Sequence, residues 1–223
     1  MFVLILSNAA SAEPCTVNTK LKKVGTEAKL ILRNEECPDS DRRVVKVLLQ
    51  RDTESPLLLL RKTQRLSDAP FGGGSFVDLA RDGIPAVDVT GSCSQPNCEH
   101  DIYRLSEDRE SMYHFYTGGY SSVSHAGRFF VTESYGSYSS WEYLAYDLTA
   151  TQTYPGRAFQ YSIYVEAIDS KPTGEVLKSR CTISTLGAKN QLTIADSPPR
   201  ELLKYCENYG KNYVLSKTRA RKK

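Results

Sequence analysis

An acidic turn carries the clearest chemical signal in the chain. Asp78 and Asp82 stand four residues apart and Gly83 follows, as in loops that bind calcium. A calcium ion needs about six to eight oxygen ligands, which alternate carboxylates supply while glycine permits the sharp turn. Alanines occupy two positions where further ligands are expected, and Asp88 comes two residues late. The turn therefore predicts one weakly held calcium ion on these three carboxylates, or a plain Asp-Gly turn with no cofactor.

The acidic turn runs on into a strand and a close cysteine pair, and this run resembles a known family. The run is D-x-x-x-D-G-x-P, a short apolar strand, and S-C-x4-C with Pro-Asn before the second cysteine. It is similar to bacterial periplasmic, calcium-binding, lysozyme-inhibitor-like proteins, and the likeness extends more loosely over residues 44–150. The resemblance implies an all-β periplasmic fold that binds rather than catalyses. The matching residues are Asp78, Asp82, Gly83, Pro85, Val87, Val89, Ser92, Cys93, Pro96, Asn97 and Cys98.

A serine-rich segment, residues 132–144, is the predicted partner-binding loop. Tyr and Trp give rigid contact area and Ser gives adaptable hydrogen bonds, a combination that binding loops use. The resemblance points to the same segment, with Glu133 and Glu142 at its base able to pair with a cationic lysozyme. The alternative is a solvated hairpin tip. The predicted binding residues are Ser134, Tyr135, Ser137, Tyr138, Ser139, Ser140 and Trp141.

The histidines give little support to an enzyme. His100, His114 and His125 lie in no hydrolase or zinc-protease motif. We expect His114 to be a strand residue and His125 to be a loop residue, and His125 is the only base we would assign to a hydrolase. The chain is therefore predicted not to be an enzyme.

Six cysteines indicate a disulfide-bonded, exported protein. Six cysteines allow 15 connectivities, and the local spacings favour Cys15–Cys37, Cys93–Cys98 and Cys181–Cys206. Zinc is the competing interpretation for the cluster of Cys93, Cys98 and His100, but no second pair completes four ligands.

The elements that position these residues are predicted to be strands. Alternating or β-branched runs separated by turn residues are typical of a β-meander or sandwich. The glycine-rich segment 67–75 reads as a flexible link, and 197–210 as a short helix with proline in its first turn and glycine at its end. Two predicted strands flank the acidic turn, the first of them carried by Phe76, Val77 and Leu79. The other predicted strands are 27–33, 43–52, 56–66, 101–105, 112–116, 128–134, 141–148, 159–167 and 176–183. The fold class is thus all-β, an antiparallel sandwich or meander with a short C-terminal helix stapled by a disulfide.

Length and charge set the organisation. Residues 1–12 resemble the end of a signal peptide with an Ala-Ser-Ala cleavage site, residues 13–210 form a single β domain, and residues 211–223 hold a final strand and a basic tail. The formal charge is +3, but it comes from the tail, so nucleic acid is not an expected partner. Such a tail is usually a solvated end, and the alternative is contact with an anionic surface. The tail cations are Lys217, Arg219, Arg221, Lys222 and Lys223.

These features predict a periplasmic binding protein. Its partner is a lysozyme-like muramidase or another envelope protein, which it inhibits or protects against through the serine loop. The second hypothesis is a non-catalytic structural envelope protein or secretion-system accessory protein with a degenerate calcium loop. A wall hydrolase using His125 is the third.

Overall fold

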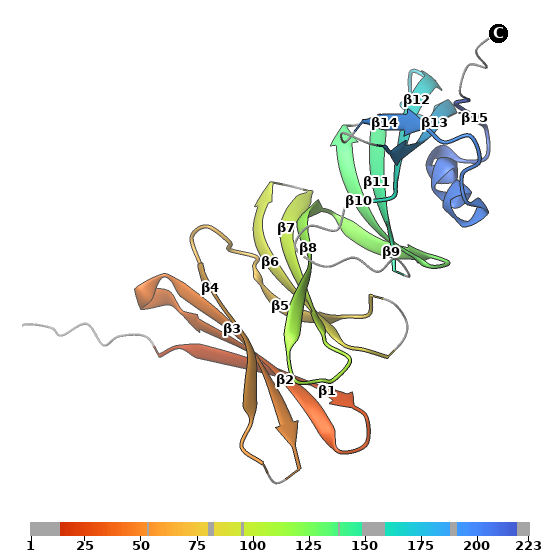
Figure 1. Cartoon of the computed structure of the whole chain (residues 1–223). Coiled ribbons are helices and arrows are strands. Elements are labelled where there is room, and N and C mark those ends of the chain that lie inside the picture. Colours follow the sequence, from red (N-terminus) through yellow and green to blue (C-terminus); the bar gives the residue numbers. More distant parts are fainter. Residues whose placement is uncertain are drawn as a thin grey trace, which may run out of the picture.

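The structure is a computed structural model that describes residues 14–52, 54–79, 83–94, 96–137, 139–148, 159–187 and 191–217. The described strands form three sheets that follow one another along the chain, named here sheet A, sheet B and sheet C (Figure 1). All the paired strands are antiparallel except β13 and β15.

Sheet A is a four-stranded meander in chain order. Its strands are β1 (Thr16–Val24), β2 (Ala28–Cys37), β3 (Arg42–Arg51) and β4 (Leu57–Arg65), with the short helix η1 (Pro38–Ser40) between β2 and β3. Successive side chains of a strand point to opposite faces. The alternating apolar residues Leu30 and Leu32 of β2, and Val45 and Val47 of β3, are therefore buried on one face of sheet A.

Sheet B is a second four-stranded meander, and both of its faces are used. Val87, Val89 and Tyr103 belong to a core shared with sheet A, whereas Ile102 and Tyr116 belong to a core shared with sheet C. Sheet B therefore lies between the other two sheets (Figure 1). Its strands are β5 (Gly73–Val77), β6 (Ala86–Ser94), β7 (Asn97–Leu105) and β8 (Met112–Tyr120).

Sheet C has seven strands and is covered on one face by helix η3 (Arg200–Tyr209). The helix follows Pro199 and ends at Gly210, whose positive φ of 97° suits glycine. It buries Leu202, Tyr205 and Cys206 against the sheet. The strands of sheet C are β9 (Ser122–Ala126), β10 (Phe129–Ser137), β11 (Ser140–Asp147), β12 (Tyr161–Ser170), β13 (Val176–Leu186), β14 (Leu192–Ile194) and β15 (Tyr213–Leu215).

The predicted fold class is confirmed, and so are the disulfides. The chain forms antiparallel sheets with one short C-terminal helix, and Cys181–Cys206 links that helix to β13. Cys15–Cys37 and Cys93–Cys98 are also paired, and the six cysteines leave no free thiol. Three disulfides indicate an oxidising compartment outside the cytoplasm. Within the described residues, no helix has the length and apolar character needed to cross a membrane.

The prediction of a flexible glycine link is wrong. Gly73 and Gly74 begin β5, and Gly74 lies against sheet A, where its backbone N–H donates to Asn34 Oδ1 (2.6 Å) and its carbonyl accepts from Asn34 Nδ2 (3.1 Å). A Cβ atom at Gly74 would stand 2.7 Å from Val45 Cγ1 and 2.9 Å from Leu32 Cδ1. The glycine is there because two backbones approach closely, not because the chain needs freedom.

Two further differences concern strands. Sequence reasoning did not predict β1, whose polar residues hide its pairing with β2. It placed His125 in a loop, but His125 lies on β9 opposite Phe130. His114 does lie on a strand, β8, as predicted.

Candidate partner-binding hairpin

The predicted serine loop is the end of the β10–β11 hairpin. Ser134, Tyr135 and Ser137 lie on β10, Ser140 and Trp141 lie on β11, and Ser139 lies in the turn. Tyr135 faces Trp141 and Ser137 faces Ser140, with an irregular register between these two pairs. Tyr138 lies outside the described residues. We call residues 134–141 the hairpin end.

The serines of the hairpin end close the turn by bonding to one another. Ser137 Oγ lies 2.8 Å from Ser140 Oγ and 3.4 Å from Ser139 Oγ, and it accepts from the Ser139 N–H at 3.3 Å. Ser140 is only 6% exposed, so it supports the turn from inside. Ser134 is half-buried and donates to the Gly119 carbonyl at 3.2 Å. Among the described serines of the hairpin end, Ser137 and Ser139 are therefore the exposed ones.

Aromatic side chains lie beside these hydroxyls. The rings of Tyr135 and Trp141 meet edge to face, with centroids 4.9 Å apart and planes at 74°. Such an arrangement is favourable for aromatic pairs and holds both rings in place. Trp141 is half-buried and packs with Tyr209 of helix η3 against the core of sheet C. The hairpin end thus offers hydroxyls next to a fixed aromatic surface.

Asn97 of sheet B holds the backbone of the hairpin end through two hydrogen bonds. Asn97 Oδ1 accepts from the Tyr135 N–H (3.2 Å), and Asn97 Nδ2 donates to the Tyr135 carbonyl (3.3 Å). Asn97 begins β7 directly before Cys98, which is bonded across the strands to Cys93. The cysteine motif and the serine segment, which lie far apart in the sequence, therefore meet. Sequence reasoning assigned no role to Asn97, because only the tertiary contact shows what its amide does.

The core beneath the hairpin end is rich in buried tyrosines. Burial raises the pKa of Tyr143 and of Tyr205, whose rings lie 4.8 Å apart. Tyr143 donates to Asn208 Oδ1 of helix η3 at 2.9 Å, and the Ser124 and Tyr205 hydroxyls lie 2.7 Å apart. These bonds fix the helix to the sheet that carries the hairpin end.

Of the three carboxylates of the predicted calcium turn, Asp88 is bonded inside sheet B. Asp88 lies on β6 with its side chain 9% exposed, and it accepts from His100 Nδ1 at 2.9 Å and from the Tyr120 hydroxyl at 2.9 Å. The His100 and Tyr120 rings stack at 3.6 Å. Asp88 is therefore a buried hydrogen-bond acceptor within sheet B. Asp78 follows β5, and Asp82 lies outside the described residues.

No three His, Cys, Asp or Glu side chains of the described residues gather in a way that could hold a metal ion. This holds for the Cys93, Cys98 and His100 cluster too, because both cysteines are in a disulfide. His125, the residue considered as a base, donates from Nε2 to the Leu79 carbonyl, and its own carbonyl accepts from Lys204 Nζ at 2.6 Å.

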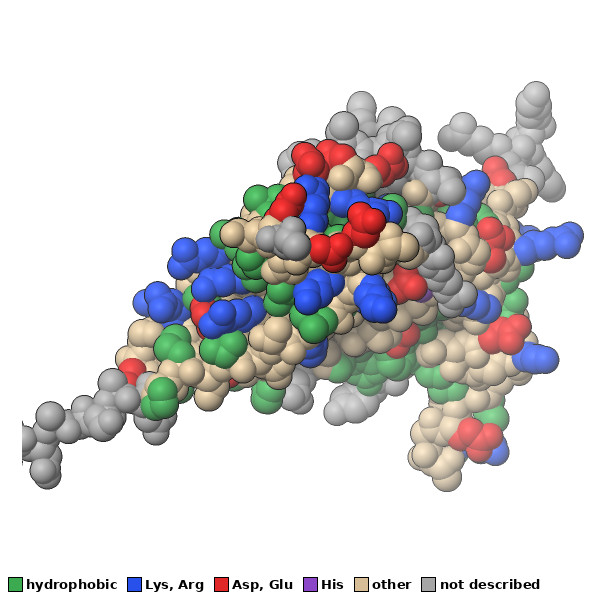
Figure 2. Space-filling view, turned by 90° about the horizontal axis from the view of Figure 1, so that it is seen from below, with side chains coloured by type: hydrophobic (Ala, Val, Ile, Leu, Met, Phe, Trp, Pro, Cys, Tyr) green, Lys and Arg blue, Asp and Glu red, His purple; other side chains and the backbone are tan. Residues whose placement is uncertain are grey.

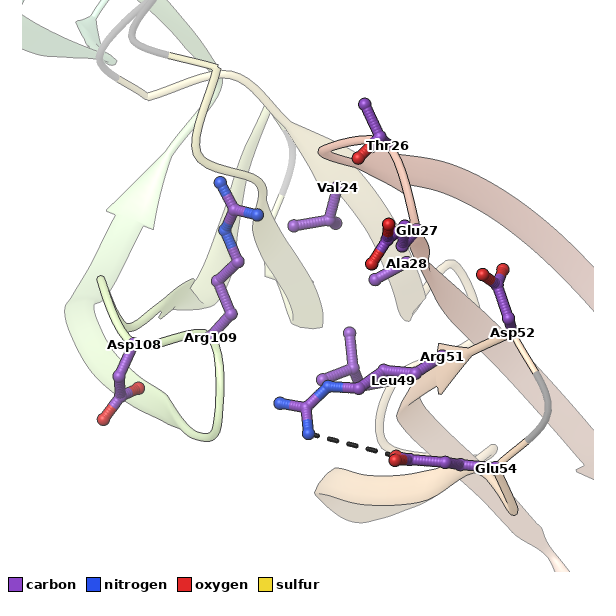
Figure 3. Close-up of a pocket in the computed structure, with 10 residues that line it drawn as sticks. All are labelled: Val24, Thr26, Glu27, Ala28, Leu49, Arg51, Asp52, Glu54, Asp108 and Arg109. Carbon is purple, nitrogen blue, oxygen red and sulfur yellow. Dashed lines mark ion pairs between the residues drawn. The ribbon is translucent and has the colours of Figure 1, made fainter.

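A cleft of about 460 Å³ opens where the turns of sheet A and sheet B meet. Figure 3 shows Arg109, from the β7–β8 turn, extending toward the β1–β2 turn, where Arg109 Nη1 would stand 2.7 Å from a Cβ atom on Gly25. Arg51 lies across the cleft and pairs with Glu54 (4.0 Å) and Glu110 (3.4 Å). The cleft is lined by four carboxylates, of Glu27, Asp52, Glu54 and Asp108, and by two guanidinium groups, of Arg51 and Arg109, so its lining is acidic on balance.

Comparison with protein-family models, with curated proteins and with solved structures finds no match to this chain.

Proposed function

We propose that the protein is a non-catalytic, exported binding protein that inhibits, or protects against, a peptidoglycan-cleaving muramidase through the hairpin end. The observation that supports this proposal best is the pair of hydrogen bonds between the Asn97 side chain and the Tyr135 backbone. Asn97 belongs to the neighbouring sheet and lies beside the Cys93–Cys98 disulfide. A binding loop that is already ordered loses less conformational entropy on association.

The chemistry of the hairpin end suits a muramidase cleft. Such a cleft carries two carboxyl groups and a groove for sugar rings. Ser137 and Ser139 are exposed hydroxyls able to donate to carboxylates, and Tyr135 and Trp141 give flat area for the groove. Glu133 and the exposed Glu142 near the base would attract a cationic enzyme. In this proposal the oxidising compartment is the bacterial periplasm.

The test is lysis of peptidoglycan by muramidases of several types, followed as loss of turbidity, with and without the protein. The double variant Tyr138→Ala, Ser139→Ala should weaken inhibition by at least about tenfold, since central interface residues commonly cost more than 1 kcal/mol each when truncated. Its melting temperature should stay within a few degrees, because Ser139 is an exposed turn residue and surface substitutions usually change stability little.

The matched control is a double variant at another exposed turn, Lys171→Ala, Thr173→Ala, between β12 and β13. It should inhibit as the unchanged protein does. Equal loss in both double variants, or no inhibition of any muramidase at micromolar concentration, would refute the proposal. Lysis by the protein alone would instead favour the hydrolase hypothesis.

The second candidate is a structural or accessory protein of the envelope. The observation that favours it is that sheet A lies at the end of the molecule away from the hairpin end, with sheet B between them (Figure 1). A protein that links partners needs a second contact surface of this kind.

A further inference from the structure

Among the described residues, no hydrophobic core forms on the second face of sheet A. One face of the sheet holds Leu30, Leu32, Val45 and Val47 against sheet B. Residues adjacent to these in β2 and β3 point the opposite way, because side chains alternate along a strand. We call that side the outer face of sheet A. Ile31 and Leu48 of the outer face belong to none of the hydrophobic cores that the described residues form.

An apolar row crosses the outer face from one edge of the sheet to the other. The strand register pairs Leu21 with Ile31, Ile31 with Leu48, and Leu48 with Leu58. Four strands therefore each contribute one aliphatic side chain to one line. Leu21 is 62% exposed and Leu58 50% exposed, at the two ends of the row. Three strand spacings make the row about 14 Å long.

Basic side chains border the apolar row on both sides. Lys23 and Lys29 are cross-strand partners on one side of the row. Arg33, Lys46 and Arg61 are successive partners on the other side. Rows on one face are two residues apart along a strand, which is about 7 Å. Figure 2 shows Lys and Arg side chains together with apolar side chains over the end of the molecule that holds sheet A.

One carboxylate lies on the outer face, and it is already paired. Glu35 bonds to Lys46 at 2.7 Å and to Arg33 at 3.2 Å, which lowers the pKa of Glu35. Strands β1–β4, whose residues the structure describes throughout, otherwise present only cations and neutral side chains on this face. Glu27 and Asp52, in the turns beside this face, line a pocket together with Lys23 and Lys29. The strands themselves are complementary to a partner that is acidic on its flanks and apolar in the middle.

Protection against edge pairing does not explain the whole pattern. Lysines on an edge strand such as β1 commonly prevent aggregation. Arg33 and Lys46, however, lie on the central strands β2 and β3, where no edge needs protection. Nor does edge protection account for aliphatic side chains aligned across all four strands.

We infer that the outer face of sheet A binds an acidic amphipathic helix of a protein partner. A helix has a diameter of about 10–12 Å, and ten residues span about 15 Å, so three turns would lie along the apolar row between the two basic borders. Leu or similar residues at i, i+3, i+4 and i+7 would contact the row. Asp and Glu on both flanks of the helix would reach the lysines and arginines.

A helix, which is a narrow ridge, fits the outer face better than a flat lipid surface does. The apolar row is one side chain wide, with a basic border about 7 Å away on each side, and this narrow width matches a helix rather than an extended lipid surface. The strands of sheet A also place no aromatic ring on the outer face, which disfavours stacking on nucleobases or sugars.

The test is binding of a fluorescent synthetic peptide of about 18 residues, above the length at which isolated helices are marginal in water, with leucines on one helical face and glutamates along both flanks. The full chain should bind it, and should bind a scrambled peptide of the same composition at least about tenfold more weakly. The measurement is fluorescence anisotropy at physiological ionic strength, where charges more than about 8 Å apart are largely screened.

Two double variants that change the charge by the same amount compare the outer face of sheet A with its opposite face. Lys29→Glu, Arg33→Glu alters both borders of the row and should weaken binding by about tenfold. Lys20→Glu, Lys22→Glu alters exposed lysines on the opposite side of β1 and should leave binding within about twofold. Leu21→Ser, Leu58→Ser should also weaken binding, whereas Leu192→Ser, at an exposed leucine of sheet C, should not.

Several results would overturn the inference. They are equal binding of the scrambled peptide, equal losses in the two charge-reversal variants, and absence of peptide binding by a folded protein. Binding to phosphatidylglycerol vesicles that is lost in Lys29→Glu, Arg33→Glu while the peptide does not bind would make the outer face a lipid surface instead. None of these readouts depends on inhibition of a muramidase.

Discussion

At the scale of single residues, a buried arginine and a closely packed glycine join sheet A to the segment that leads into sheet B. Arg43 is 3% exposed, and its guanidinium donates to the Ala69 carbonyl (2.6 Å), the Pro70 carbonyl (3.4 Å) and Glu36 (2.8 Å). A buried charge of this kind is tolerated because its donors are satisfied. The bonds fix the chain just before the glycines that enter β5.

Gly74→Ala should destabilise the protein by about 1–3 kcal/mol, because its Cβ atom would meet Val45 and Leu32 at less than 3.0 Å. Chemical denaturation followed by circular dichroism measures the change. The matched control is Gly119→Ala on β8, where the nearest atom to an added Cβ is 3.8 Å away. Gly119→Ala should be neutral or slightly stabilising. If Gly74→Ala proves as mild as the control, the close approach of β5 to sheet A is wrong.

At the scale of elements, helix η3 depends on its covalent link to β13. The helix has ten residues in a 3-10 pattern, a longer run than this geometry usually sustains alone. Leu202, Tyr205 and the Cys181–Cys206 disulfide hold it on sheet C. Tertiary contacts, rather than helix propensity, keep it in place.

Replacing Cys181 and Cys206 together by alanine should lower the free energy of unfolding by about 3 kcal/mol, because the disulfide closes a loop with a sequence separation of 25. The near-ultraviolet circular dichroism of the tyrosines around η3 should weaken at the same time. The control is Cys93→Ala, Cys98→Ala, whose sequence separation is only 5, and which should cost less in the chain-entropy account. The reverse order of the two losses would contradict this account.

At the scale of the whole molecule, tyrosines contribute to the hydrophobic core of each sheet. The chain has 14 tyrosines, and burial is the main cause that raises the pKa of a group of them spread over sheets B and C and helix η3. The group consists of Tyr103, Tyr116, Tyr120, Tyr143, Tyr146, Tyr205 and Tyr209.

These tyrosines should make the protein unstable at alkaline pH. Their folded pKa values lie above the unfolded value of about 10, so the stability that they contribute is full below that pH and is lost as pH rises through the folded pKa values. Tyrosinate absorbance should show only part of the tyrosines ionising near pH 10 in the folded protein, and the rest ionising together on unfolding. In denaturant all should titrate as one group. Ionisation of all 14 near pH 10 in the folded protein would refute the prediction.

Much of the candidate site was visible in the sequence as residue types, but not as geometry. Ser137, Ser139, Tyr135 and Trp141 were found because they cluster in one segment. That Ser140 faces inward, and that Asn97 holds Tyr135, follows from contacts between β10, β11 and β7. Asp88 was predicted as a possible metal ligand, and only the structure shows its bonds to His100 and Tyr120.

The sequence by itself determined the local features. Alternating apolar residues, the closeness of paired cysteines, and proline and glycine at the ends of η3 are short-range signals, and each gave the correct element or bond. The tertiary structure decided how the strands divide into three sheets, why Gly74 must be glycine, and that Leu21, Ile31, Leu48 and Leu58 form one row. The physical reason is that strand register is a long-range property. A slip of one residue moves every side chain of a strand to the other face, and the pattern within a single strand does not fix its alignment with the next.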